Sequence, residues 1–237
     1  MASTAAWRPA ATLLLADLRA IFGDRLRSVV AYGPAIDGVA DAPLTCMALV
    51  GSLGSADLEA CAARAHQWRR ERLSIPLILP EDEFRRSLDA FPLEYGEILR
   101  THERIAGEDP FDGVEVTHDD LRRACETQIK SHLMHLREGY IVSGGRPQAV
   151  AELVAGSAPA FAALLRNVAR LVGVTSRERM EATREGARAA GLPEGVVADI
   201  LALEHPTAMP SADPARLFPT YLTAVEQLAR MVDTWRA

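Results

Sequence analysis

The second half of the chain carries helical periodicity and no strand signal, which restricts the folds that the protein can adopt. From Thr117 onwards, apolar residues recur every three or four positions, as on one face of a helix. Thr117 and Asp120 have the spacing of a helix N-terminal cap, and glycines separate the successive helical segments. The apolar stripe of the first segment consists of Leu121, Cys125, Ile129, Leu133, Leu136 and Tyr140. This pattern predicts an all-α helical bundle, which we assign to residues 116–237.

The first part of the chain has a different pattern, in which short apolar runs end at Gly or Pro. Such runs are typical of buried strands that enter tight turns. Helical spacing also occurs, first between Trp7 and Gly23 and then after Ser55, which is placed to cap a helix. We expect strands over residues 28–32, 45–50, 74–79 and 104–106, and further short helices over 81–88 and 94–100. Residues 1–115 are therefore predicted to form an α+β domain with a mixed sheet.

The composition is that of a globular protein. Hydrophobic residues make up 49% of the chain and charged residues 24%, whereas aromatic residues make up only 5%. The formal net charge of -6 provides no overall basic face, so we expect neither nucleic acid nor an anionic membrane as a partner. No run of about 18 apolar residues is present, so no membrane span is expected.

The cysteines give no sign of a metal or disulfide framework. Cys46, Cys61 and Cys125 are three in number and widely spaced, without a CxxC or Cys/His ligand pattern. We therefore expect reduced thiols, and with them a cytoplasmic location.

The segment that joins the first two predicted strands carries the most informative motif. Tyr32-Gly33-Pro34-Ala35-Ile36-Asp37-Gly38 follows the first strand, and Thr45-Cys46-Met47 begins the second. This arrangement resembles the signature of the nucleotidyltransferase superfamily, which includes polymerase β and the aminoglycoside nucleotidyltransferases. That signature is a strand, Gly-Ser, a second Gly and a strand bearing Asp-x-Asp. The segment from Asp89 to Glu94 adds to the likeness, since it resembles the Asp-x-Phe-Pro-x-Glu segment of uncharacterised bacterial nucleotidyltransferase-like proteins.

The resemblance implies a site that binds a nucleoside triphosphate and two metal ions. Its glycines, here Gly33 and Gly38, let the backbone approach the phosphates. Its strand aspartates, with a third carboxylate nearby, hold Mg²⁺, which neutralises phosphate charge and activates the attacking hydroxyl. We also count Thr45 among the candidate ligand-binding residues, because it begins the second predicted strand of this motif.

The sequence departs from the family pattern where the metal ligands belong. Pro34 replaces the serine of the signature, and Thr45 and Met47 stand where the two aspartates align. A thioether is a poor ligand for a hard cation such as Mg²⁺. The third predicted strand, residues 74–79, contains no carboxylate either. We therefore expect a degenerate site without a metal ion.

Other carboxylates are weaker candidates for a rearranged site. Asp37 and Asp41 lie in the loop after Gly33, where aspartate more often hydrogen-bonds its own backbone. Asp89 and Glu94 flank Phe91-Pro92 and would form an acid–base pair if the turn brought them together, although a helix terminus explains them as well.

The histidines also have two readings. His102 is either a functional residue or a structural residue on a partly apolar helix, and we favour the structural role. His132 and His135 are neighbours on one helix face and would begin a metal site only if a further ligand joined them.

Three functions remain open at this point. The first is a catalytically degenerate binding or regulatory module, which holds a nucleotide or small anion at Gly33, Pro34, Gly38 and Thr45. The second is an active Mg²⁺-dependent nucleotidyltransferase with relocated carboxylates at Asp37, Asp41 or Glu94. The third is a structural protein whose helical domain forms a homo-oligomer, such as a homodimer, or binds another chain.

Overall fold

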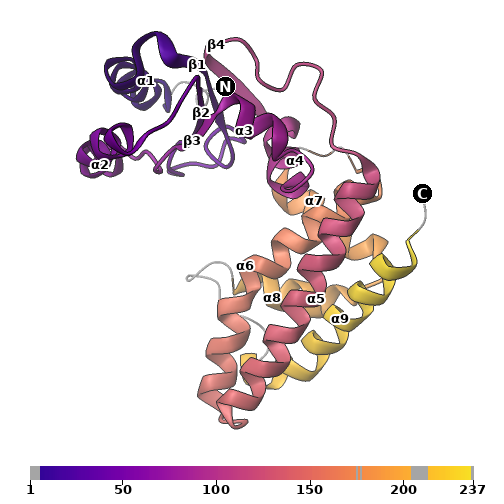
Figure 1. Cartoon of the computed structure of the whole chain (residues 1–237). Helices are drawn as coiled ribbons and strands as arrows, with labels where there is room; N and C mark the ends of the chain where they lie inside the picture. The colour runs from indigo at the N-terminus through magenta and orange to yellow at the C-terminus, as the bar shows by residue number, and fades with distance from the viewer. Residues whose placement is uncertain (1–5, 175, 177, 204–212, 236–237) are drawn as a thin grey trace. The chain divides into compact units, whose positions relative to one another are not determined.

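A computed structural model of the protein describes residues 6–174, 176, 178–203 and 213–235. The contacts within the chain divide it into two compact units, Met1–Val116 and Thr117–Ala237. The first unit contains a sheet with helices and the second is helical (Figure 1). The predicted fold class, an α+β part with a mixed sheet followed by an all-α bundle, is confirmed.

The first unit is built on a four-stranded mixed sheet with the strand order β3-β2-β1-β4. The central strand β1 pairs antiparallel with both β2 and β4, and β2 pairs parallel with β3. The elements are α1 (Arg8–Phe22), a 3-10 turn (Gly23–Arg25), β1 (Leu26–Tyr32), β2 (Thr45–Val50), α2 (Ser55–Arg70), β3 (Leu77–Pro80), α3 (Glu81–Arg86), α4 (Pro92–Arg100) and β4 (His102–Gly107). The long loop between β1 and β2 is therefore a hairpin connection.

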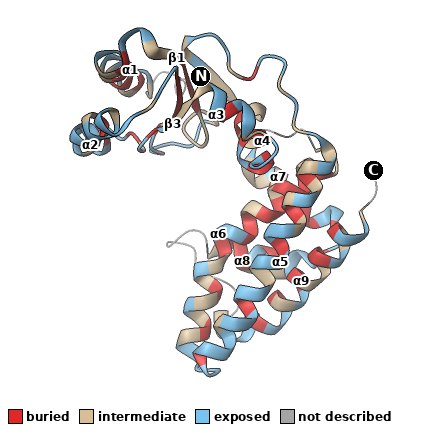
Figure 2. Cartoon of the chain, in the orientation of Figure 1, coloured by how far each residue is buried: buried red, intermediate tan, exposed pale blue. Residues whose placement is uncertain are grey.

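Successive side chains of a strand point to opposite faces of the sheet, so each strand contributes to two apolar clusters. Cys46 and Ala48 of β2 pack in the cluster that includes Leu14 of α1 and Trp68 of α2. The residues that alternate with them face the opposite way, into a cluster with α3 and α4. Helices α1 and α2 lie together on one side of the sheet (Figure 1), and the central strands are buried (Figure 2).

Several boundaries in the first unit differ by a few residues from the sequence expectation, and two of the differences have a local cause. Gly54, not Ser55, precedes the first turn of α2, because the Asp57 carboxylate accepts the Gly54 N–H at 2.9 Å and makes that residue the cap. Strand β3 begins at Leu77 rather than at residue 74, since Pro76 has no N–H to donate to a ladder.

The second unit contains the helices α5 (His118–Ser143), α6 (Pro147–Leu171), α7 (Arg179–Ala189), α8 (Glu194–Ala202) and α9 (Pro214–Thr234). The predicted cap of α5 is confirmed, because the Thr117 hydroxyl accepts the Asp120 N–H at 3.1 Å. The buried residues of these five helices face the interior of the second unit (Figure 2). The Pro- and Ser-rich segment from Pro206 to Pro214 predicts a loop, but it falls largely outside the described residues. Helix α9 begins at Pro214.

Helix α6 is longer than its apolar stripe in the sequence indicates. Phe161, Leu164, Leu165, Val168 and Val172 recur at helical spacing and predict a helix that ends at Gly173. In the structure α6 already starts at Pro147 and runs through Pro159. By length and composition alone, α6 could cross a membrane, although a core helix of a soluble protein passes the same test. In this structure α6 packs against α5, α7, α8 and α9, which accounts for its apolar character.

We expect the contact between α6 and α7 to be intolerant of added volume. A Cβ atom on Gly186 of α7 would lie 1.9 Å from the Leu165 carbonyl oxygen of α6, so the backbones themselves must separate. Gly186→Ala should destabilise the helical unit by about 2 kcal/mol, as overpacking does in other cores. Gly156→Ala, at an exposed α6 position with no atom within 4 Å of the added Cβ, is the matched control and should stabilise by about 0.5 kcal/mol. Urea unfolding followed by far-UV circular dichroism measures both values; equal stability for the two variants would contradict this packing.

Candidate functional site

The turn after β1 is closed by its own backbone. The N–H groups of Ile36 and Asp37 donate to the Gly33 carbonyl at 2.9 and 3.0 Å, and the Val39 N–H donates to the Pro34 carbonyl at 2.9 Å. Gly33 and Gly38 have φ angles of 80° and 88°, which favour glycine at both ends of the turn. Three amide donors are thus engaged inside the turn and Pro34 has none, so the turn has fewer donors to offer a phosphate than the signature implies.

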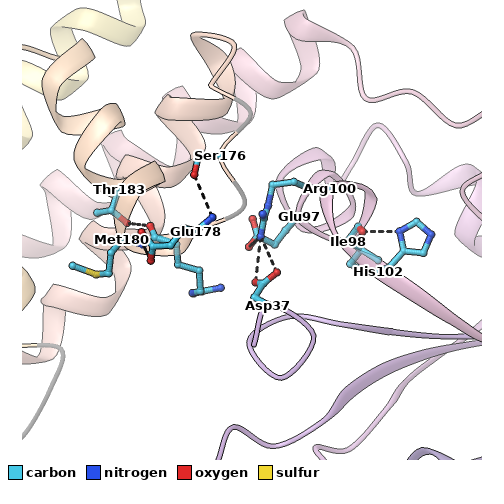
Figure 3. Close-up of polar contacts among 10 residues, drawn as sticks. Asp37, Glu97, Ile98, Arg100, His102, Ser176, Glu178, Met180 and Thr183 are labelled. Atoms are coloured by element: carbon cyan, nitrogen blue, oxygen red, sulfur yellow. Dashed lines mark hydrogen bonds and ion pairs between the residues drawn. The ribbon is translucent and has the colours of Figure 1, made fainter. Parts of the chain in front are cut away.

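Asp37 is held by an arginine rather than directed at a metal site. Its side chain is 3% exposed, and its carboxylate lies 3.3 Å from the guanidinium of Arg100, the last residue of α4. Arg100 also approaches Glu97 at 3.6 Å (Figure 3). The ion pair joins residues 63 positions apart and ties the glycine turn to α4. Asp37 is therefore part of the turn's support, as a partner of Arg100.

Asp41 lies near a different arginine. Its carboxylate is 2.9 Å from Arg72, and the Leu44 N–H donates to the Arg72 carbonyl at 2.8 Å. Asp41 and Arg72 both have positive φ angles, 64° and 60°, in the two loops that this contact fastens together. Since the Asp41 side chain is 85% exposed, the carboxylate lies in solvent. Asp37 and Asp41 thus serve separate contacts.

The two positions that align with the family aspartates differ in their surroundings. Thr45 is half-buried at the start of β2, with its hydroxyl 3.4 Å from the Ser74 hydroxyl. Met47 is 1% exposed and lies opposite Val30 of β1 and Leu77 of β3. The neighbouring strand positions therefore supply no carboxylate to a metal ion beside Met47.

The face of the sheet at Met47 is covered by an apolar cluster that we call the Met47 cluster: Val30, Met47, Leu49, Phe84, Tyr95, Ile98 and Phe111. Phe84 makes edge-to-face contacts with Tyr95 and Phe111, with ring centroids 5.2 and 5.4 Å apart. The Tyr95 hydroxyl lies 2.7 Å from the Ser87 hydroxyl. Mg²⁺ requires several oxygen ligands, so the residues of this face do not fit a two-metal centre. Within the described part of the chain, no group of three or more His, Cys, Asp and Glu residues is arranged to hold a metal ion.

Asp89 and Glu94 are both exposed, and no hydrogen bond or ion pair joins them in the part of the chain that the structure describes. Glu94 lies in the first turn of α4, where a negative charge favours the helix terminus. Phe91, with no side-chain cap bond, precedes that helix. The helix-terminus interpretation of Glu94 therefore explains its place without an acid–base role.

His102 is on a strand, not on a helix as expected. It is the first residue of β4, and its Nδ1 lies 2.9 Å from the Ile98 carbonyl oxygen. Its Nε2 lies 3.1 Å from the Asp109 carboxylate, which also accepts the Phe111 N–H at 2.9 Å. Burial opposes ionisation of Asp109, but the Phe111 N–H and His102 together lower its pKa. Sequence spacing did not reveal this pair, which fastens the loop after β4.

His132 and His135 contact different groups in the structure. His132 points into the helical unit, where its Nε2 lies 2.8 Å from the Tyr221 hydroxyl of α9. That hydroxyl also lies 3.1 Å from the Ser157 hydroxyl of α6. His135 is exposed, and its Nδ1 lies 3.4 Å from Ser131. The two imidazoles therefore have different partners, and the inner one links three helices.

No protein-family model and no curated protein sequence matches the chain. A solved structure does: the spectinomycin adenyltransferase of Enterococcus faecialis, determined with ATP and spectinomycin, superimposes with a TM-score of 0.61 over 93% of this chain and 98% of that one. The sequences are 12% identical over this match, a level at which the likeness shows the fold alone. The protein therefore has a nucleotidyltransferase-like fold.

Proposed function

We propose that the protein is a catalytically inactive nucleotidyltransferase-like protein that acts as a binding or regulatory module. The observation that carries this proposal is the burial of Met47, at 1% exposure, in an apolar cluster on the sheet face where family members place acidic side chains. Metal-assisted phosphoryl transfer depends on oxygen ligands that hold the ions and neutralise the phosphates. The Met47 cluster offers hydrocarbon and a thioether at that position instead.

The remaining carboxylates support the same proposal. Asp37 is buried against Arg100, Asp41 is exposed beside Arg72, and Glu94 is exposed at the start of α4. A relocated metal centre would need these groups to converge on ions about 4 Å apart. Their separate partners give that alternative no specific support.

A nucleotide is the first ligand to test, because the fold neighbour was determined with ATP. The binding surface that we propose is the turn with Gly33, Pro34 and Gly38, together with Thr45 of β2. Since this surface lacks metal ligands, Mg²⁺ should add nothing to binding. Any affinity should come from the base, the ribose and the remaining polar groups of the turn.

The decisive experiment compares binding and turnover with and without Mg²⁺. Calorimetric titrations with ATP, GTP and CTP should give dissociation constants that Mg²⁺ changes by less than about threefold, a difference below 1 kcal/mol. An assay for pyrophosphate release with spectinomycin as acceptor should give no signal above a heat-inactivated control. Mg²⁺-dependent pyrophosphate release that Asp37→Asn abolishes would overturn the proposal in favour of relocated carboxylates.

A further inference from the structure

The helical unit contains a cavity, far along the chain from the glycine turn. It lies between α7 and α8 and has a volume of about 600 Å³, within the range of small-molecule sites in proteins. Ala187, Leu192, Val197 and Leu201 line it, and each is at most 6% exposed. The inner surface of the cavity is therefore apolar.

Two arginines on one side of α7 supply charge to this cavity. Arg184 and Arg188 are one helical turn apart, and both line the space. Arg188 is paired with Glu185 on the same helix. Arg184 is exposed and has no hydrogen bond or ion pair to any residue that the structure describes. Arg184 is thus the cation available to a ligand.

The walls of the cavity are held in place by contacts with other helices. The Gln227 amide of α9 donates to the carbonyls of Ala190 and Gly191, at 2.8 and 2.9 Å, and so fixes the turn between α7 and α8. Gly186 lets the α7 backbone approach Leu165 of α6 closely. A cavity formed by such fixed backbone needs little ordering when a ligand binds, which favours affinity.

We infer that the cavity between α7 and α8 binds a small apolar molecule that carries one carboxylate, with the carboxylate on Arg184 and the apolar body against Leu192, Val197 and Leu201. The arginine guanidinium and a carboxylate carry opposite charges, and both are planar, so two parallel N–H···O hydrogen bonds can form between them. A single negative charge is required, because Glu194 also lines the cavity and would repel a second one. This inference is independent of the function proposed for the glycine turn, and its ligand is not a nucleotide.

The full-length protein can be tested with three probes of equal chain length, all below their micellar concentrations. Octanoate should bind saturably with one molecule per chain and at least tenfold more tightly than octylammonium, with octanol between them. Calorimetry or ligand-observed NMR measures these affinities. Absence of saturable octanoate binding, or equal binding of octylammonium, overturns the inference.

Substitutions separate the contribution of charge from that of shape. Arg184→Gln should weaken octanoate at least tenfold and leave octanol unchanged. Arg230→Gln is the matched control, because Arg230 is exposed on α9 and does not line the cavity. Ala198→Trp, at an exposed position of the cavity wall, should fill the space and abolish binding of octanoate and octanol while the far-UV spectrum stays native. Unchanged octanoate affinity in Arg184→Gln, or in a folded Ala198→Trp variant, contradicts the site.

Discussion

Met47→Asp is expected to unfold the first unit rather than to restore a metal ligand. The new carboxylate would lie among Val30, Phe84 and Tyr95, at a position where the native side chain is 1% exposed. The substitution removes the packing of a buried methionine and places an ionisable group in an apolar cluster without a partner. The two effects together should destabilise the unit by about 5 kcal/mol, most of the stability of an ordinary domain.

Two control variants separate the effect of a buried carboxylate at position 47 from a general effect of substitution in β2. Met47→Leu keeps the volume and apolar character of the side chain and should cost less than about 1.5 kcal/mol. Thr45→Asp adds the same carboxylate two residues earlier, where the side chain is half-buried, and should leave the unit folded.

Tryptophan fluorescence can follow the first unit by itself. Trp68 is fully buried there, with its indole N–H 2.8 Å from Asp17, and Trp235→Phe removes the tryptophan of the second unit. Urea unfolding in that background measures each substitution. A Met47→Asp variant that stayed as stable as the parent and gained Mg²⁺ affinity would show that a metal site lies within reach of this strand.

The helical unit is expected to lose stability as the pH falls from about 6.5 to about 4. Burial, with a smaller effect of His135, lowers the pKa of His132 from 6.5 to about 4. In the unfolded chain His132 binds its proton near pH 6.5, whereas in the folded chain it stays neutral until about pH 4. The unfolded state therefore takes up more protons in this interval, so the stabilisation is complete above pH 6.5 and is lost as the pH falls towards 4. The full difference corresponds to about 3 kcal/mol.

Matched histidine variants isolate this effect from the titration of carboxylates, which all variants share. His132→Gln can still hydrogen-bond the Tyr221 hydroxyl but cannot be protonated, so its stability should depend less steeply on pH between 6.5 and 4. His135→Gln, at the exposed position three residues away, should keep most of the parent's slope. Thermal or urea unfolding by far-UV circular dichroism at half-unit pH steps gives both slopes. Identical slopes for His132→Gln and the parent protein would show that His132 does not titrate in this way.

Local patterns in the sequence were sufficient for much of the fold. The apolar run from Thr45 to Val50 matches β2, and the Thr117 cap and the stripe that follows it match the start of α5. The apolar stripe from Phe161 marked only the second half of helix α6, because Pro159 interrupts the helical pattern just before it. The absence of aspartates at positions 45 and 47 could be recognised from the sequence, because identifying a residue type requires no three-dimensional information.

The partners of the site residues could not be read from the sequence. Asp37 and Arg100 are 63 positions apart, and their pairing depends on how β4 returns beside β1. The different partners of His132 and His135 likewise depend on which side of α5 faces α9. Sequence spacing describes neighbours on one element, whereas these contacts are set by the packing of elements that lie far apart along the chain.

The position of β1 at the centre of the sheet has a consequence for synthesis on the ribosome. Its two partners are β2, which ends at Val50, and β4, which ends at Gly107. Until the last of these residues has left the exit tunnel, one side of β1 keeps unpaired N–H and C=O groups beside apolar side chains. Such an open strand edge is a template for pairing with another nascent chain. Protection of the emerging polypeptide, by chaperones or by rapid elongation, is therefore most needed over the stretch between Val50 and Gly107.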